Sequence, residues 1–371
     1  MIDTNRLLSL FEKLISFDSP SFDERRIGDF VTQQLHKLGL DLCEDGAAEV
    51  IGGSCGNLHA YLEGSLDLPP LLFCAHLDTV EPSRNKKMQI SEGGMITSTG
   101  ETVLGADDCA GIASILEALT ALKASNLPHR PIELLFTVAE EPYCRGAQAL
   151  DLSMIYSREA YVLDLTGPVG TAAYQAPTIL SFMAQFTGRS AHAGFAPEQG
   201  IHAIGVAACA VAALPCGRID DHTTLNFGTI TGGTADNIVP DRCTLTGEIR
   251  SFSDADAARL LADITHSMQR IAKEHGAKAD ISHTVHVAAY RTDPESAVAK
   301  RFQSACRQLG LAGHLVYTFG CSDNNYLAQK GIQGIVVATA MNNCHSTSEY
   351  TTIAELDRAA HLVLALMLSK E

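Results

Sequence analysis

Histidines and carboxylates follow four short apolar runs in this sequence. The runs cover residues 71–75, 132–139, 160–163 and 335–340. The residues close behind them are His76, Asp78, Glu140, Glu141, Asp164 and His345. A further acidic pair, Asp107 and Asp108, opens a segment with apolar residues at helical spacing. In an open α/β sheet, ligands bind outside the carboxyl ends of the strands, so we expect these side chains to meet in one crevice. Carboxylates and imidazoles gathered in this way are typical of a site for divalent metal ions.

The spacing within each pair suggests how such a site could work. His76 and Asp78 are two residues apart at a strand end, so both point to the same face. One ring nitrogen of His76 could bind metal while Asp78 holds the other. Of the adjacent glutamates, one could bind metal while its neighbour takes a proton from water. Each pair also has a plain alternative: a surface His–Asp pair and a solvated turn.

The remaining positions are equally ambiguous when each is taken alone. Asp107 and Asp108 could simply cap a helix, and Asp164 could begin a turn. As a set, however, two histidines and three carboxylates suit two zinc ions that share one bridging carboxylate. Nitrogen and oxygen ligands favour Zn²⁺, with Mn²⁺ or Co²⁺ as substitutes.

Composition limits the classes of protein that fit. The chain has 371 residues, of which 46% are hydrophobic and 19% charged, so a sizeable core is expected. A net charge of -16 argues against a nucleic-acid partner. No apolar stretch reaches the roughly 18 residues that span a bilayer, so no membrane partner is expected. Eleven cysteines without a CxxC spacing indicate reduced thiols in a cytoplasmic protein.

The order of predicted elements indicates the fold class. Before residue 176 the expected helices cover residues 4–16, 23–38 and 107 onward, and the expected strands cover residues 50–51, 58–62, 71–75 and 132–139. A hairpin is expected over 82–102, and helices at 295–309 and 353–368. Strand–helix–strand at this spacing predicts an α/β fold with a mixed, mostly parallel sheet flanked by helices.

A different pattern occupies residues 177–288. The expected strands there are 179–186, 225–230, 243–252 and 279–287, and the expected helices are 200–214 and 254–275. Strands with two helices on one face predict a small α+β domain, ferredoxin-like in type, inserted into the larger one. Residues 1–176 and 289–371 would then form a discontinuous catalytic domain.

Several motifs resemble a known family. In order along the chain they are CAHLDTVEP, TVLGADDCAGIA, FTVAEEPYCRGAQALD, YVLDLTG, GRSAHAGFAPEQGIHAI, FGTITGGTADNIVPDRC, GEIRSF, GCSDNN and CHSTSEY. They resemble the M20 family of co-catalytic zinc peptidases, and are most similar to its peptidase T-like branch. The resemblance runs from the first helix to the last and implies the family's zinc-exopeptidase fold.

The resemblance implies a role for each residue of the set. Asp107 would bridge both zinc ions, His76 and Asp164 would complete one metal site, and Glu141 and His345 would complete the other. Asp78 would orient His76. Glu140 would be the general base: it would take a proton from the water that bridges the two zinc ions, and this water would then attack the scissile carbonyl.

The inserted domain, residues 177–288, would be the family's lid, through which a homodimer could also form. His192 resembles the lid histidine that reaches the oxyanion, while Asn237 and Arg250 resemble residues that hold the substrate. Ser322 would line the same pocket. The plain alternatives are an exposed histidine, a turn residue before Pro240 and a surface arginine paired with Glu248. Lysine often follows the two aspartates in the family, where this chain has Cys109, which leaves substrate choice open.

We therefore expect a di-zinc exopeptidase acting on short peptides, similar to a tripeptide aminopeptidase. An N-acyl amino acid deacylase or a carboxypeptidase of the same family would use the same chemistry with different pocket contacts. A non-catalytic metal-binding protein is the alternative from another class, but such a protein has no use for a base at position 140. A nucleotide-binding protein is not expected, because no GxGxxG follows a strand and no GxxxxGK[ST] occurs.

Overall fold

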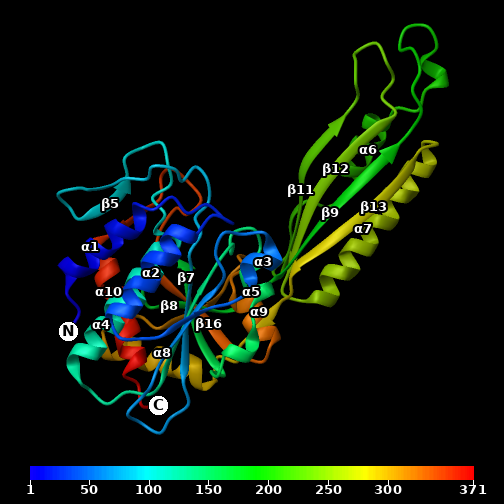
Figure 1. The fold of residues 1–371 in the computed structure, drawn as a ribbon. Coiled ribbons are helices and arrows are strands. Elements are labelled where there is room, and N and C mark those ends of the chain that lie inside the picture. Colours follow the sequence, from blue (N-terminus) through cyan, green and yellow to red (C-terminus); the bar gives the residue numbers. More distant parts are fainter. The chain divides into compact units, whose positions relative to one another are not determined.

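The computed structural model describes all 371 residues, which form two compact units (Figure 1). The first unit comprises Met1–Gln175, Arg291–Thr318 and Ser322–Glu371. The second comprises Ala176–Tyr290 with the short segment Phe319–Cys321. None of the helices combines the length and the apolar character that a membrane crossing requires.

A nine-stranded mixed sheet is the centre of the first unit. Its strands are β1 (Leu42–Glu44), β2 (Leu58–Leu62), β3 (Leu71–His76), β6 (Ile132–Thr137), β7 (Glu159–Thr166), β8 (Thr171–Ala176), β14 (Tyr290–Arg291), β15 (His314–Tyr317) and β16 (Gln333–Met341). The spatial order is β1-β2-β6-β3-β7-β16-β8-β14, with β15 paired to β8. The central pairs β6–β3, β3–β7 and β7–β16 are parallel. The predicted α/β class with a mostly parallel sheet is therefore confirmed.

The helices of the first unit cover this sheet. They are α1 (Thr4–Ile15), α2 (Arg25–Lys37), α3 (Ala47–Ile51), α4 (Ala106–Ser125), α5 (Arg145–Ala149), α8 (Ala297–Gln308), α9 (Asn324–Gln329) and α10 (Ile353–Met367), with a 3₁₀ turn at Leu152–Met154. Helix α4 packs on β3, β7 and β16 and is itself covered by α1 and α10. It is therefore buried on nearly all sides. Helices α5 and α9 lie on the other side of the sheet (Figure 1).

One predicted element is wrong. Val50 and Ile51 were expected to be a strand because β-branched residues favour strands, but they belong to the short helix α3. The Asp45 carboxylate accepts a hydrogen bond from the backbone N–H of Ala47 at 3.0 Å, in the turn that precedes this helix. Gly52, at φ 74°, ends it. A pair of residues is too short for its propensity to decide between strand and helix.

The predicted hairpin at 82–102 is present. Strands β4 (Met88–Ile90) and β5 (Met95–Ser98) pair in antiparallel fashion. A third strand, β17 (Tyr350–Thr352), adds to β5 and forms a small separate sheet. This pairing connects the hairpin to the segment that follows His345.

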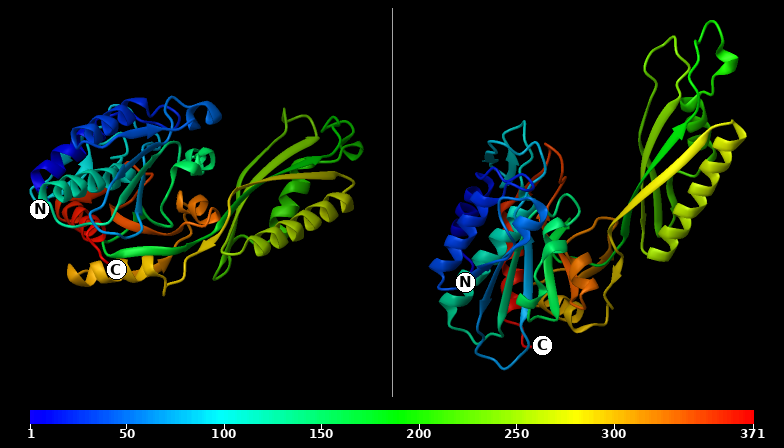
Figure 2. Two further views of the ribbon diagram at one scale, coloured as in Figure 1. Left: turned by 60° about the horizontal axis from the view of Figure 1, so that its bottom comes forward. Right: turned by 45° about the vertical axis from the view of Figure 1, so that its right-hand side comes forward.

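The second unit has a core of its own. Its five antiparallel strands are β9 (Thr178–Thr187), β10 (Gly217–Asp220), β11 (Thr223–Gly232), β12 (Arg242–Ser251) and β13 (Lys278–Val287), in the order β10-β11-β12-β9-β13. Helices α6 (Ala203–Ala213) and α7 (Asp254–Glu274) pack on one face, and Pro197–Gln199 is a 3₁₀ turn. Alternate residues of β12, from Cys243 to Ser251, are buried under these helices. Figure 2 shows the helices on the same side of the sheet in two further views.

The central position of β3 leads to a stability prediction. Phe73 is fully buried, and its ring centroid lies 5.6 Å from that of Tyr161 on β7. Phe73→Ala should lower the free energy of unfolding of the first unit by about 3–5 kcal/mol, because it leaves a cavity between strands and helices. Val50, 72% exposed, provides the control. Val50→Ala should change the free energy by less than about 0.5 kcal/mol. Chemical denaturation would measure both, and equal effects would contradict the assigned core.

Candidate metal centre

Parallel pairing brings the predicted residues to one edge of the sheet. His76, the last residue of β3, is in register with Thr137, the last residue of β6. Strands β7 and β16 run in the same direction beside them. The chain beyond β6 carries Glu140 and Glu141, the end of β7 carries Asp164, and the loop after β16 carries His345. The sheet therefore gathers residues that are more than 250 positions apart in sequence.

Asp107 is the centre of this group. Its Oδ1 lies 3.0 Å from Nε2 of His76, and its Oδ2 lies 3.4 Å from Nε2 of His345. The two carboxylate oxygens therefore face different histidines, which is the arrangement that a bridging ligand requires. Asp107 and Asp108 begin α4 with non-helical backbone angles, and the peptide bond between them is cis.

The histidine of β3 is held on several sides. Its Nε2 lies 4.0 Å from Oδ1 of Asp164, and its Nδ1 lies 3.3 Å from Oδ1 of Asp78. Its backbone N–H donates to Oδ2 of Asp108 at 3.1 Å. His76 is only 2% exposed, so these contacts determine where the ring points. Asp78 thus occupies the orienting position that the two-residue spacing predicted.

The two adjacent glutamates point to different partners. Oε2 of Glu141 lies 3.0 Å from Nε2 of His345. Glu140 instead groups with His76 and Asp164, with one side-chain nitrogen or oxygen of each within 4.8 Å of the others. Both backbone N–H groups donate to Asp78, at 2.9 and 3.2 Å. The left-handed backbone of Ala139, at φ 47°, precedes the turn that separates the side chains.

Electrostatics show that negative charge is in excess here. Burial raises the pKa of Asp164 well above its ordinary value, and the Asp107 charge raises it further. Burial also raises the pKa of Glu141. Burial alone would lower the pKa of His76, but its contacts with Asp107 and Asp78 raise it well above the usual value. Each imidazole is therefore placed where a positive charge is favoured.

The donor set fits divalent cations. Oxygen and imidazole nitrogen atoms converge, and the buried Oε1 of Glu141 has no hydrogen-bond partner. A buried carboxylate oxygen without a partner is costly unless a cation satisfies it. The residues that would hold metal are those predicted: His76, Asp107, Glu141, Asp164 and His345. How they divide between two ions stays a prediction.

Three of the predicted substrate residues, His192, Asn237 and Arg250, belong to the second unit. His192 and Asn237 are close together, since the N–H of Ala193 donates to the carbonyl of Asn237 at 2.9 Å. The His192 ring stacks on Phe195 at 4.2 Å. Arg250 donates from Nε to Glu248 at 2.6 Å and from Nη1 to the carbonyl of Phe319 at 2.7 Å. Their roles toward a substrate stay predictions.

Ser322 belongs to the first unit and is 2% exposed. Its hydroxyl accepts a hydrogen bond from the N–H of Asn324 at 3.3 Å, at the start of α9. The structure thus gives this side chain a capping contact, and its predicted contact with substrate stays a prediction.

Sequence reasoning missed several carboxylates that support the site. Asp108 accepts from the backbone of His76 and of Gly111, each at 3.1 Å. Glu24, fully buried, accepts from the N–H of Ala139 at 3.0 Å. Glu349 accepts from the backbone on both sides of Ala106. No spacing in the sequence connects Glu24 with position 139, or Glu349 with positions 105 and 107.

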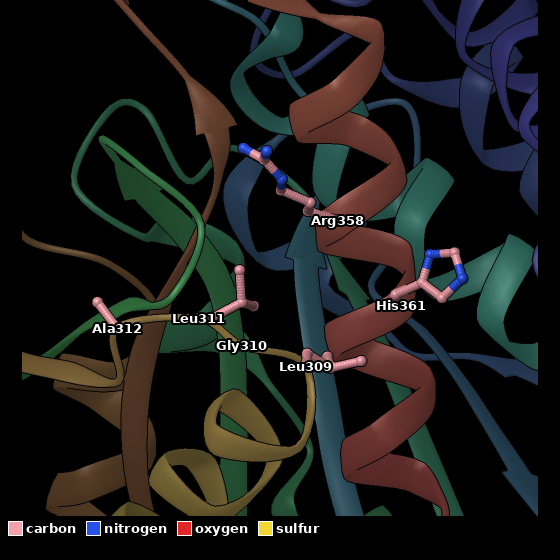
Figure 3. Close-up of a pocket in the computed structure, with 6 residues that line it drawn as sticks. All are labelled: Leu309, Gly310, Leu311, Ala312, Arg358 and His361. Atoms are coloured by element: carbon pink, nitrogen blue, oxygen red, sulfur yellow. The ribbon is translucent and has the colours of Figure 1, made fainter.

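A separate hollow of about 460 Å³ lies beside α10 (Figure 3). It is lined by Leu309, Gly310, Leu311, Ala312, Arg358 and His361. The two polar side chains project from α10, and both have partners on that helix: Arg358 pairs with Glu355, and Nδ1 of His361 hydrogen-bonds with the carbonyl of Asp357 at 2.9 Å. None of the predicted site residues lines this hollow.

Two family models match parts of the chain. Residues 175–276 match the Peptidase dimerisation domain of the M20 group, and residues 57–213 match Peptidase family M28. The second match includes His76, Asp107, both glutamates and Asp164.

Full-length relatives are similar as well. The uncharacterized protein YqjE of Bacillus subtilis is 34% identical over 367 residues, covering 99% of each chain. A tripeptidase of Staphylococcus aureus superposes with a TM-score of 0.97 at 33% identity, covering 99% of this chain and 98% of that one. Aminopeptidase PepT of Bacillus cereus superposes with a TM-score of 0.93 at 37% identity, with the same coverage.

The charges of the metal-free site predict proton release on metal uptake. Hydrogen bonds to Asp107 and Glu141 raise the pKa of His345 to about 10, so its imidazole is protonated at pH 7. A metal ion binds only the neutral ring and must displace the proton. Adding Zn²⁺ to metal-free protein at pH 7 should therefore release protons, and the apparent affinity should rise from pH 6 to pH 8. Calorimetry in buffers of different ionisation enthalpy measures the release. His345→Ala should release fewer protons, and equal release would contradict the assignment.

Proposed function

This chain belongs to the M20 family of metallopeptidases, in its peptidase T-like branch, and from that membership we propose that it is a di-zinc aminopeptidase of short peptides. The observation that carries the proposal is the position of Asp107 between His76 and His345. Similarity to proteins described as a tripeptidase and as aminopeptidase PepT supports short peptides as substrates.

Two zinc ions held by the five ligands would supply Lewis acidity and would lower the pKa of a water molecule in the site. Imidazole and carboxylate donors favour Zn²⁺, and Mn²⁺ or Co²⁺ would fit the same donors. Burial raises the pKa of Asp164 and of Glu141, and a cation beside these carboxyls would favour their charged forms.

Glu140 would move the protons of the reaction. We assign it as the general base that takes a proton from the attacking water and later passes this proton to the departing amine. Its carboxylate is 7% exposed and accepts a hydrogen bond from Sγ of Cys144 at 3.2 Å. Because the Glu141 side chain contacts His345, we assign proton transfer to Glu140.

Asp78 would orient the centre without touching the substrate. One of its oxygens faces Nδ1 of His76, and the other accepts from the hydroxyl of Ser21 at 2.7 Å. The same carboxylate holds the N–H groups of both glutamates. One buried side chain therefore aligns a metal ligand and the proposed base.

Residues of the second unit would bind the substrate. We propose that His192 reaches the oxyanion, that Asn237 holds the substrate and that Arg250 holds a carboxylate. The contacts of Arg250 with Glu248 and with the carbonyl of Phe319 hold its guanidinium group, which can pair with a carboxylate. Ser322 is proposed to line the same pocket.

Two separate observations support a proposed oligomeric state and a proposed cellular location of the protein. The match of residues 175–276 to a Peptidase dimerisation domain supports a homodimer formed through the second unit. All eleven cysteines are free thiols, which supports a cytoplasmic location with a reducing environment.

Replacement of the proposed base separates catalysis from metal binding. Glu140→Gln should lower kcat by about 10²–10⁴-fold, because the amide cannot accept the proton, and should leave the metal content unchanged. The control is Glu355→Gln, since Glu355 on α10 also accepts a backbone N–H, from Val169 at 3.0 Å. This control should keep full activity. Retained turnover in Glu140→Gln would remove residue 140 from its role.

A substrate panel tests the reaction itself. The zinc-loaded protein is incubated with di- and tripeptides, with N-acetylated tripeptides and with N-acyl amino acids, and the fragments are identified by mass spectrometry. We expect the amino-terminal residue to be released from free tripeptides and the acetylated peptides to stay intact. Release of the carboxy-terminal residue, or of an acyl group, would instead identify a carboxypeptidase or a deacylase.

A further inference from the structure

Glu349 is a buried carboxylate that is not part of the metal ligand set. It is 1% exposed. Its Oε2 accepts a hydrogen bond from the N–H of Gly105 at 2.6 Å, and its Oε1 accepts one from the N–H of Asp107 at 2.9 Å. Both donors belong to the segment that carries the bridging carboxylate. One side chain from the loop of His345 therefore holds the loop of Asp107 at two points.

The loop that carries Glu349 is itself closed. Asn342 and Tyr350 exchange backbone hydrogen bonds at 3.1 and 3.0 Å, and the N–H of Glu349 donates to the carbonyl of Ser346 at 3.0 Å. His345 lies within this closed loop, at φ 61°. The positions of His345 and Glu349 are thus coupled, and a movement of one moves the other.

His345 depends on this support more than His76 does. The side chain of His76 is 1% exposed and is surrounded by Asp78, Asp107 and Asp164. The side chain of His345 is 57% exposed, and its Nε2 contacts Asp107 and Glu141. Burial does not hold this ring, so its distance from Asp107 is determined by the position of its loop.

A buried lysine also packs against the segment that precedes α4. Lys86 is 3% exposed, and its Nζ donates to Oγ1 of Thr79 at 3.4 Å. A Cβ added to Gly105 would lie 3.2 Å from Cε of Lys86 and 3.3 Å from Cγ2 of Thr79. Gly105, at φ 81°, is therefore packed closely by Lys86 and Thr79 while Glu349 holds its N–H. The loops after β3, before α4 and after β16 meet at this glycine.

We infer that Glu349 is a positioning residue that fixes the distance between His345 and Asp107 and thereby determines the affinity for the metal ion bound by His345, Asp107 and Glu141. The inference rests on the metal centre proposed above. A glutamine at this position has one acceptor oxygen, and its NH₂ group cannot accept from an N–H. One of the two backbone amides would then be buried without a partner, which favours separation of the two loops.

The chain offers a closely matched control at Glu133. This carboxylate is 0% exposed and also accepts from two backbone N–H groups, those of Tyr156 at 3.0 Å and Ser157 at 2.8 Å. It lies near the start of β6, at the end of the strand opposite to the site. Glu133→Gln removes the same kind of acceptor without touching a loop that carries a ligand.

Cobalt titration of the metal-free proteins, followed by visible absorption and by metal analysis after dialysis, tests the inference. The unmodified chain and Glu133→Gln should bind two Co²⁺ ions with the same spectrum. Glu349→Gln should bind one ion as before and the second at least tenfold more weakly, with an altered spectrum. Two ions bound with affinities within twofold of the control would overturn the inference. An unmodified chain that binds no metal would instead reject the proposed function.

A second variant covers the case in which Glu349→Gln does not fold, as judged by circular dichroism of the metal-free protein. Glu349→Asp keeps both acceptor oxygens and the charge but is one methylene shorter, so it holds both amides only if the two loops draw together. It should weaken the second Co²⁺ ion by a smaller factor than glutamine does, or by several-fold where glutamine gives no folded protein. Unchanged affinity and spectrum in this variant would equally overturn the inference.

Discussion

The carboxylate of Asp107 presents one oxygen to His76 and the other to His345. The arrangement of the site depends on this contact. The two histidines come from opposite ends of the sequence, and only a shared sheet edge brings them within reach of one side chain. Asp164 and Glu141 complete the surroundings with two further carboxylates. Buried carboxylates grouped in this way favour a cation beside them, which supports the proposed metal site.

Backbone amides hold the carboxylates that do not bind metal. Asp78 accepts from the two glutamates, Asp108 from His76 and Gly111, and Glu349 from the segment before α4. In each case one acidic side chain joins two segments that are distant in sequence. The backbone hydrogen bonds favour the charged carboxylate, but burial outweighs them at Asp108 and Glu349, where the pKa is raised.

The second unit has a separate hydrophobic core beneath α6 and α7, built from alternate residues of its strands. The residues proposed to hold metal all belong to the first unit. The match of residues 175–276 to a Peptidase dimerisation domain covers most of the second unit.

The sequence by itself determined the ligand types, the strand ends that carry them and the mostly parallel sheet, because apolar runs followed by charged residues depend on local pattern alone. The grouping of Glu141 with His345 came from the resemblance to the family and not from the spacing of the residues. The sequence did not determine the helix at Val50 and Ile51, because two residues are too few to show a periodic pattern. Nor did it assign Glu24, Asp108 or Glu349, because a carboxylate that holds backbone amides has no characteristic spacing. Those contacts exist only after distant loops have been brought together, so only the tertiary structure decided them.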